Sequence, residues 1–161
     1  MAAKRKTLPD DFADQLKTKT VDELIAVFDT TELAAYSSQG KQCALAYAEC
    51  PDDLTRWLVA QGLDVDTRNS SGWTPLASRA KRPEANLQIL LELGANIDGG
   101  GVVGVPLIAA VAAQSLDHVK LLIERGADPL KPGSVGGDNA LESAVERCDR
   151  HRIDKALPIV E

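Results

Sequence analysis

The chain has 161 residues, of which 44% are hydrophobic and 26% charged, so it can bury one ordinary core but has no surplus for a second large domain. Its formal net charge of −6 argues against nucleic acid and anionic membranes as partners, because either would require concentrated Lys and Arg. Aromatic residues make up only 4%, which favours closely packed short helices over a β-sandwich built on large rings.

Residues 1–37 are expected to form a basic tail and a helical cap. The short run KRK at 4–6 is typical of a solvated, disordered terminus. A helix is predicted after Thr20, because Thr20 and Glu23 have the spacing of a capping box. Its apolar face comprises Val21, Leu24, Ile25 and Phe28. The flanking stretches PDDFADQL and TELAAYSS are also expected to be helical.

The rest of the chain repeats itself. Leu45, Leu76 and Leu107 fall 31 residues apart twice, in the contexts CALAYA, TPLASRA and VPLIAA, and a fourth copy, NALESA, follows 34 residues later. The first three copies each lead into a second apolar stretch and a turn: LTRWLVAQGLDVD at 54–66, LQILLELGANID at 87–98 and VKLLIERGADP at 119–129. The period therefore describes two helices and a turn.

Local chemistry supports the same elements. Thr74 can cap a helix whose first position is Pro75, where a missing N–H has no cost. A glycine follows each second apolar stretch and can take the left-handed conformation that ends a helix; these are Gly62, Gly94 and Gly126. No single pair of such short helices buries enough apolar surface alone, so the pairs must stack and both ends must be sealed.

These motifs resemble those of the ankyrin-repeat family. TPLASRA and VPLIAAV are similar to its TPLHxA motif, and LLELGANID and LLIERGADP are similar to its Gly-Ala-Asp turn. The resemblance implies an all-α solenoid of helix-turn-helix pairs with hairpin-like turns, sealed by the N-terminal helices and by DRHRIDKALPIV at the other end. We expect a single structural domain with a cap at 1–37 and a repeat region at 38–161, whose repeats are 38–68, 69–99, 100–132 and 133–161.

The repeats are divergent. The motif histidine is replaced by Ala46, Ala77, Ile108 and Glu142, and the first copy lacks Thr-Pro. Small divergent ankyrin proteins of this kind resemble bacterial, stand-alone ones.

Candidate chemical sites are weak. GGGVVG at 99–104 has the spacing of a phosphate-cradling loop, but it follows a helix and a turn where a dinucleotide site needs a strand, so we interpret it as a loop between repeats. His118 and His151 lack metal-ligand neighbours at suitable spacing, which favours a packed and a solvated histidine. No nucleophile and base pair is evident. The sequence therefore predicts no enzyme, no cofactor and no metal.

The cysteines and apolar runs bear on the compartment. Cys43, Cys50 and Cys148 form neither a disulfide framework nor a zinc motif, and buried, reduced thiols are expected. No run approaches the ~20 apolar residues of a membrane span, and no apolar segment follows the N-terminal charges. We expect a soluble, cytoplasmic protein.

The resemblance implies a binding surface on the concave side, where the residue before each Thr-Pro position and the ends of the first helices lie. Trp73 would be its aromatic anchor and Arg82 its charged one; alternatively, Trp73 folds over the neighbouring finger and only shields the stack. Trp57 is expected to be buried. The residues predicted to contact a partner are Gln42, Ser70, Ser71, Trp73, Lys81, Arg82, Val102, Val103, Ala113, Asp138, Glu146 and Arg147.

Two functional hypotheses follow. The first is a module that grips one dedicated protein and blocks its working surface, as an immunity or antitoxin protein blocks a toxin, with an acidic inhibitor suited to a basic toxin. The second is a scaffold or regulatory adaptor that binds proteins without inhibiting them. A small-molecule binder is disfavoured, and nucleic acid and membrane are not expected as partners. The free protein is expected to be a monomer; the convex back or the N-terminal helices could also make the contact.

Overall fold

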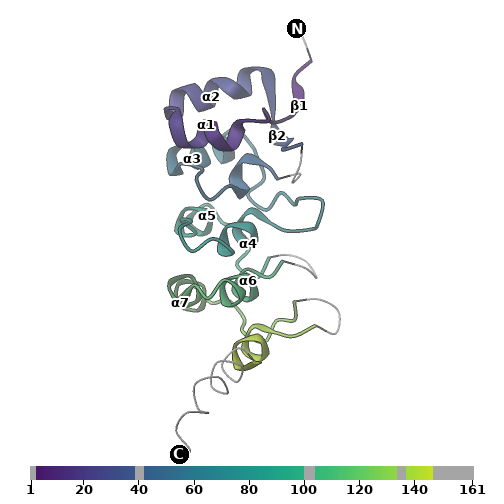
Figure 1. Ribbon diagram of the computed structural model, residues 1–161, viewed down its shortest axis with the longest axis vertical. Coiled ribbons are helices and arrows are strands. Elements are labelled where there is room, and N and C mark those ends of the chain that lie inside the picture. Colours follow the sequence, from purple (N-terminus) through teal and green to yellow (C-terminus); the bar gives the residue numbers. More distant parts are fainter. Residues whose placement is uncertain (1–2, 39–41, 100–103, 134–136, 147–161) are drawn as a thin grey trace, which may run out of the picture.

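The computed structural model describes residues 3–38, 42–99, 104–133 and 137–146, which form an elongated stack of helical layers (Figure 1). Its elements are β1 (Arg5–Thr7), α1 (Phe12–Thr18), α2 (Val21–Thr30), β2 (Thr31–Tyr36), the 3-10 turn η1 (Ala44–Ala46), α3 (Asp52–Ala60), α4 (Pro75–Ala80), α5 (Gln88–Glu92), α6 (Pro106–Ala112) and α7 (Leu116–Glu124). A further helical segment covers residues 140–146.

Two of the three predicted cap helices are confirmed, as α1 and α2. The Thr20 hydroxyl accepts from the main-chain N–H of Glu23, and the Glu23 carboxylate accepts from the N–H of Thr20 at 2.8 Å, so the capping box forms. Leu24 and Phe28 of α2 are buried, and Phe12 of α1 packs edge-on against Phe28 with ring centroids 6.1 Å apart. The apolar spacing in α2 therefore builds the contact between the two cap helices.

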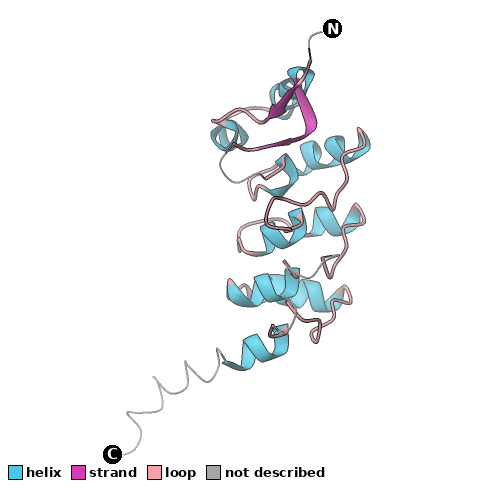
Figure 2. Ribbon diagram, turned by 90° about the vertical axis from the view of Figure 1, so that its right-hand side faces the viewer, coloured by secondary structure: helices cyan, strands magenta, loops and turns pink. Residues whose placement is uncertain are grey.

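Two expectations for the cap were wrong. TELAAYSS is not a helix, because residues Thr31–Tyr36 form β2, which pairs in parallel with β1 at the end of the stack (Figure 2). The run at 4–6 is not a free tail either, since β1 supplies partners for the β2 backbone and Lys4 Nζ donates to the Phe28 carbonyl at 2.6 Å. An extended segment after α2 returns the chain beside its own beginning, and this pairing spans too many residues to show in local periodicity.

The second and third predicted helix pairs are confirmed, as α4 with α5 and α6 with α7. The first pair has only the turn η1 before α3, and the fourth is described only at 140–146. The first helices, η1, α4 and α6, form one column, and the second helices, α3, α5 and α7, form the other (Figure 1). Thr74 caps α4 by accepting from the Ala77 N–H at 3.3 Å, with Pro75 at the first helical position. We call the side formed by the first helices and their connecting loops the inner face, and the side formed by the second helices the outer face.

The repeated leucines hold the layers together. Leu45, Leu76 and Leu107 are each no more than 1% exposed, whereas the matching Leu141 is 54% exposed at the end of the described stack. Cys43 and Cys50 are buried free thiols, as expected. Trp57 is only half-buried against Phe28, so its expected full burial was wrong.

Two further expectations concern single side chains. His118 is packed inside the stack, where Nε2 lies 2.9 Å from the Ala85 carbonyl oxygen. The glycine stretch at 99–104 follows α5 and a turn, as predicted, although residues 100–103 lie outside the described part of the chain. Cys148 and His151 also lie outside it.

Candidate functional site

The loop that carries Trp73 is folded around Asn69. The Asn69 side-chain oxygen accepts from the main-chain N–H groups of Ser71 and Trp73, both at 2.9 Å, and the Asn69 N–H donates to the Trp73 carbonyl at 3.0 Å. Gly72 completes the turn with φ of +82°, which a side chain would strain. This local network fixes the main chain of Trp73 immediately before α4.

Trp73 lies between its own helix and the next loop. A Cβ atom placed on Gly104 would lie 3.1–3.2 Å from Trp73 atoms, so the tryptophan packs directly on the following repeat. On the ring face, Lys81 Nζ lies 3.2 Å from the centroid, a cation–π contact. The indole is half-buried and therefore both covers the next loop and keeps some exposed surface. The structure thus brings together Trp73 and Lys81, two of the predicted contact residues.

A second predicted pair meets in a hollow of about 230 Å³ on the inner face. Gln42 and Arg82 both line it, although they are 40 positions apart in the sequence. We call this site the cap hollow, because α1 also contributes to it. Its lining residues are Ala13, Gln42, Ala46, Tyr47, Ala48, Glu49, Ser78 and Arg82.

The cap hollow follows from a local departure in the first repeat. Where the later repeats have the helices α4 and α6, the first has only the single turn η1, and the chain then continues through Tyr47 in an extended conformation. The shortened element leaves space between α1 and α4. Residues 46–49, which directly follow this turn, form much of the lining.

Arg79 connects η1 and α4, the two elements of the repeats that flank the cap hollow, by buried hydrogen bonds. Its guanidinium is fully buried and donates to the Leu45 carbonyl at 2.8 Å, the Asn86 carbonyl at 3.1 Å and the Thr55 hydroxyl at 3.1 Å. Burial lowers the pKa of Arg79, while Cys50 and Asp52 partly oppose the shift. Because Leu45 belongs to η1 and Arg79 to α4, these bonds position the exposed side chains of α4.

The remaining predicted residues are spread along the stack. Ser70 lines a separate shallow depression with Tyr36 and Arg68, while Ser71 is exposed at the loop tip. Ala113 ends α6, the main-chain carbonyl of Asp138 accepts from the Gly133 N–H, and Glu146 lies in the helical segment 140–146. Three predicted contacts lie outside the described residues: Val102, Val103 and Arg147.

Sequence reasoning missed Tyr47, Glu49 and Ser78. Ser78 lies within α4 and Arg82 two residues after its end, and both line the hollow. Tyr47 precedes Ser78 by the same 31 residues that separate Leu45 from Leu76. Applying the repeat offset to the first copy would have found Tyr47. The opening beside it depends on the shortened helix and could not be found in this way.

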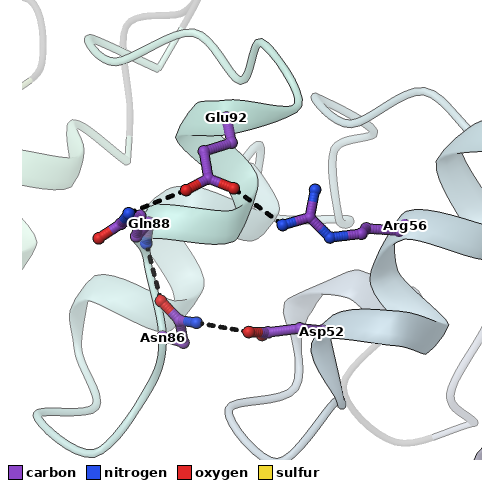
Figure 3. Close-up of polar contacts among 5 residues, drawn as sticks. All are labelled: Asp52, Arg56, Asn86, Gln88 and Glu92. Carbon is purple, nitrogen blue, oxygen red and sulfur yellow. Dashed lines mark hydrogen bonds and ion pairs between the residues drawn. The ribbon is translucent and has the colours of Figure 1, made fainter.

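The outer face is tied by paired polar groups, which Figure 3 shows. Arg56 of α3 forms an ion pair with Glu92 of α5 at 2.9 Å, and Asn86 donates to Asp52 at 2.8 Å. Gln88 also donates to Glu92, and the hydrogen bonds from Gln88 and Arg56 lower the pKa of the Glu92 carboxyl. These outer-face groups are engaged within the stack, unlike Arg82, which has no carboxylate at ion-pair distance among the described residues.

Metal-binding clusters and membrane-spanning helices are both absent from the described ranges. No cluster of three or more His, Cys, Asp or Glu side chains there is placed to hold a metal ion. None of the helices in the described part of the chain is long and apolar enough to cross a membrane.

Comparison with known proteins identifies the repeats. The family profile described as "Ankyrin repeats (3 copies)" matches residues 42–133. A curated relative from Atelerix albiventris, "Ankyrin repeat, SAM and basic leucine zipper domain-containing protein 1", is 38% identical over 82 residues. That alignment covers 47% of this chain and 17% of the relative, so the chain spans under a fifth of the relative's length.

Proposed function

The chain belongs to the ankyrin-repeat family, and from this premise we propose that it binds one dedicated protein partner through its inner face. Ankyrin repeats are generally protein–protein interaction modules, and the family is not an enzyme family. The observation that supports the choice of face is the contact of the half-exposed Trp73 ring with Lys81, whose neighbour in the sequence, Arg82, lines the cap hollow. Buried aromatics with a neighbouring arginine are the usual anchors of protein interfaces.

We propose further that binding blocks the partner's working surface, as an immunity or antitoxin protein blocks a toxin. This step rests on analogy with small, divergent ankyrin proteins. The module would act in the cytoplasm and would be a monomer when free. The buried free thiols of Cys43 and Cys50 support a reducing compartment.

The alternative is a scaffold or regulatory adaptor. The relative from Atelerix albiventris is named for ankyrin repeats, SAM and basic leucine zipper domains in one chain, which favours an adaptor role for such repeats. A dedicated inhibitor should bind at nanomolar Kd or tighter, whereas an adaptor can work at micromolar Kd. A dedicated inhibitor should also reduce the activity of the captured partner, whereas an adaptor should not.

The test is affinity capture from a lysate of the source organism with the tagged full chain, followed by mass spectrometry. The Trp73→Ala, Arg82→Glu double variant should lose a stoichiometric partner that the wild-type chain retains. Lys120→Glu is the matched control, because it reverses an exposed charge on α7 of the outer face. Equal capture by wild type and the double variant, with loss in the control, would move the interface to the outer face.

A further inference from the structure

Two adjacent cations mark the inner face of a chain that is acidic as a whole. Lys81 and Arg82 follow α4 directly and both are exposed. Lys81 is held over Trp73, and no carboxylate among the described residues lies at ion-pair distance from Arg82. The outer-face Arg56, by contrast, is paired with Glu92.

The two cations also act on each other. Burial lowers the pKa of the Lys81 ammonium, and the positive charge of Arg82 lowers it further. An anion placed beside Arg82 would relieve this repulsion. Lys81 and Arg82 therefore form a local pair of positive charges on a chain whose net charge of −6 by itself would favour a basic partner surface.

The cap hollow supplies hydrogen-bond donors beside Arg82. Ser78 of α4 and Arg82, which lies two residues after the end of α4, both line the hollow, and Gln42 is a third lining residue. A guanidinium can donate two parallel hydrogen bonds to one carboxylate, and a hydroxyl and an amide can donate to its remaining lone pairs. The other lining residues include Tyr47 and three alanines, Ala13, Ala46 and Ala48, which offer apolar contact.

We propose that the cap hollow receives an acidic peptide segment of the protein partner, with an Asp or Glu carboxylate bound by Arg82. This inference rests on the proposed protein-binding function and specifies the partner's chemistry. Gln42 and Ser78 complete the carboxylate site, and Tyr47 contacts the aliphatic part of the segment. Trp73, with Lys81 on its face, extends the contact toward the next repeat.

Glu49 provides an internal check. It is an exposed carboxylate in the lining of the same hollow, so it repels an acidic ligand and would attract a basic one. Neutralising it should strengthen binding of an acidic segment. The same substitution would weaken binding of a basic segment. The direction of the change in Kd therefore shows whether the ligand is acidic or basic.

The experiment is selection of a random peptide library, displayed on phage, against the immobilised full chain. Enriched peptides are then synthesised and their Kd measured by fluorescence polarisation. We expect enrichment of Asp and Glu, about tenfold or greater weakening with Arg82→Gln, and tighter binding with Glu49→Gln. Lys120→Gln, which removes an exposed charge from α7, should leave the Kd unchanged.

Three results would overturn the inference. Neutral or basic peptides that still require Trp73 would exclude an acidic segment, yet they would leave the proposed inner-face function standing. Acidic peptides whose Kd ignores Arg82→Gln would place the carboxylate elsewhere. Absence of any enriched peptide would show that the cap hollow holds no short segment, while the lysate capture reports separately on protein binding. Circular dichroism of each variant establishes that it is folded.

Discussion

Arg79 of the second repeat donates a 2.8 Å hydrogen bond from Nε to the main-chain carbonyl oxygen of Leu45 in the first repeat. The guanidinium is fully buried, and its other bonds go to neutral oxygens of Asn86 and Thr55. A buried cation is costly unless its donors are satisfied. Here three neutral acceptors take that role, and the bonds connect the shortened turn η1 to α4.

Replacing Arg79 should therefore destabilise the fold more than replacing an exposed arginine would. We expect Arg79→Lys to lower the free energy of unfolding by about 2–4 kcal/mol, because a single ammonium cannot reach three acceptors that a planar guanidinium spans. Urea denaturation followed by circular dichroism measures the change.

Two further variants complete that comparison. Lys120→Met on α7 removes an exposed charge and should change stability by less than about 0.5 kcal/mol. If Arg79→Met matched the wild type, packing would compensate fully for the lost hydrogen bonds, and the network would contribute no net stability.

The sequence predicted those parts of the fold that depend on local pattern. The spacing of Leu45, Leu76 and Leu107 identified the layers, and the capping residues Thr20 and Thr74 marked the starts of α2 and α4. Each of these signals lies within one element or repeats at a fixed interval. The helix pairs were therefore predictable without knowledge of tertiary contacts.

Features that depend on distant contacts were not predictable in this way. The strand β2 pairs with β1, which precedes it by two helices, so no local signal separates it from a helix. Arg79 belongs to a helical motif and looks like an exposed residue until the neighbouring repeat supplies its acceptors. Of the candidate site, the sequence predicted Trp73 and Arg82 but not the cap hollow beside them.

A glycine in place of Gln114, between α6 and α7, should make the protein more stable. Gln114 has φ of +57°, a left-handed conformation that is unfavourable for residues with a Cβ atom. We expect Gln114→Gly to raise the free energy of unfolding by up to about 1 kcal/mol, as measured by urea denaturation. Gln61, which ends α3 with φ of −78°, is the control, since Gln61→Gly should lower stability.

The cap should unfold together with the repeats. Phe12 is fully buried in α1 and packs edge-on against Tyr47 of the first repeat, with ring centroids 5.7 Å apart. We expect Phe12→Ala to cost about 3–5 kcal/mol and to shift one cooperative transition. Thermal melting by calorimetry would contradict this if it resolved a separate early transition for the cap with the main transition unmoved.

The Cys43 thiol should make the fold sensitive to alkaline pH. Burial raises its pKa from 9.0 to about 11, against partial lowering by the main-chain groups of Leu45 and Ala46. Between these pH values the unfolded chain releases a proton that the folded chain keeps, so stability falls as pH rises. Urea denaturation at pH 8 to 11 should show a loss of at most about 1.4 kcal/mol per pH unit from this group.

The comparison that isolates Cys43 uses Cys43→Ala over the same pH range. The cavity left by the alanine changes the free energy of unfolding by the same amount at every pH. Only the slope of that free energy against pH reports the titration of the thiol. Parallel curves for the two proteins would mean that the folded thiol titrates normally.

Gly104 should control the position of Trp73 and thereby the proposed binding surface. Its φ is +74°, and an added Cβ would lie 3.1–3.2 Å from Trp73, so Gly104→Ala combines backbone strain with a steric contact. Gly62 is the matched control, because its φ is +99° but an added Cβ would have no neighbour within 4 Å. Both alanine variants should lose about 1 kcal/mol of stability from strain.

Only Gly104→Ala should also displace the indole from Lys81. In a Trp57→Phe background, where Trp73 is the remaining tryptophan, we expect its fluorescence emission to move to longer wavelength as the ring becomes more exposed. Partner capture should weaken in the same variant and not in Gly62→Ala. Unchanged emission and capture would show that the loop relaxes around the new methyl group, and that Trp73 is held by Asn69 and Lys81 independently of the next repeat.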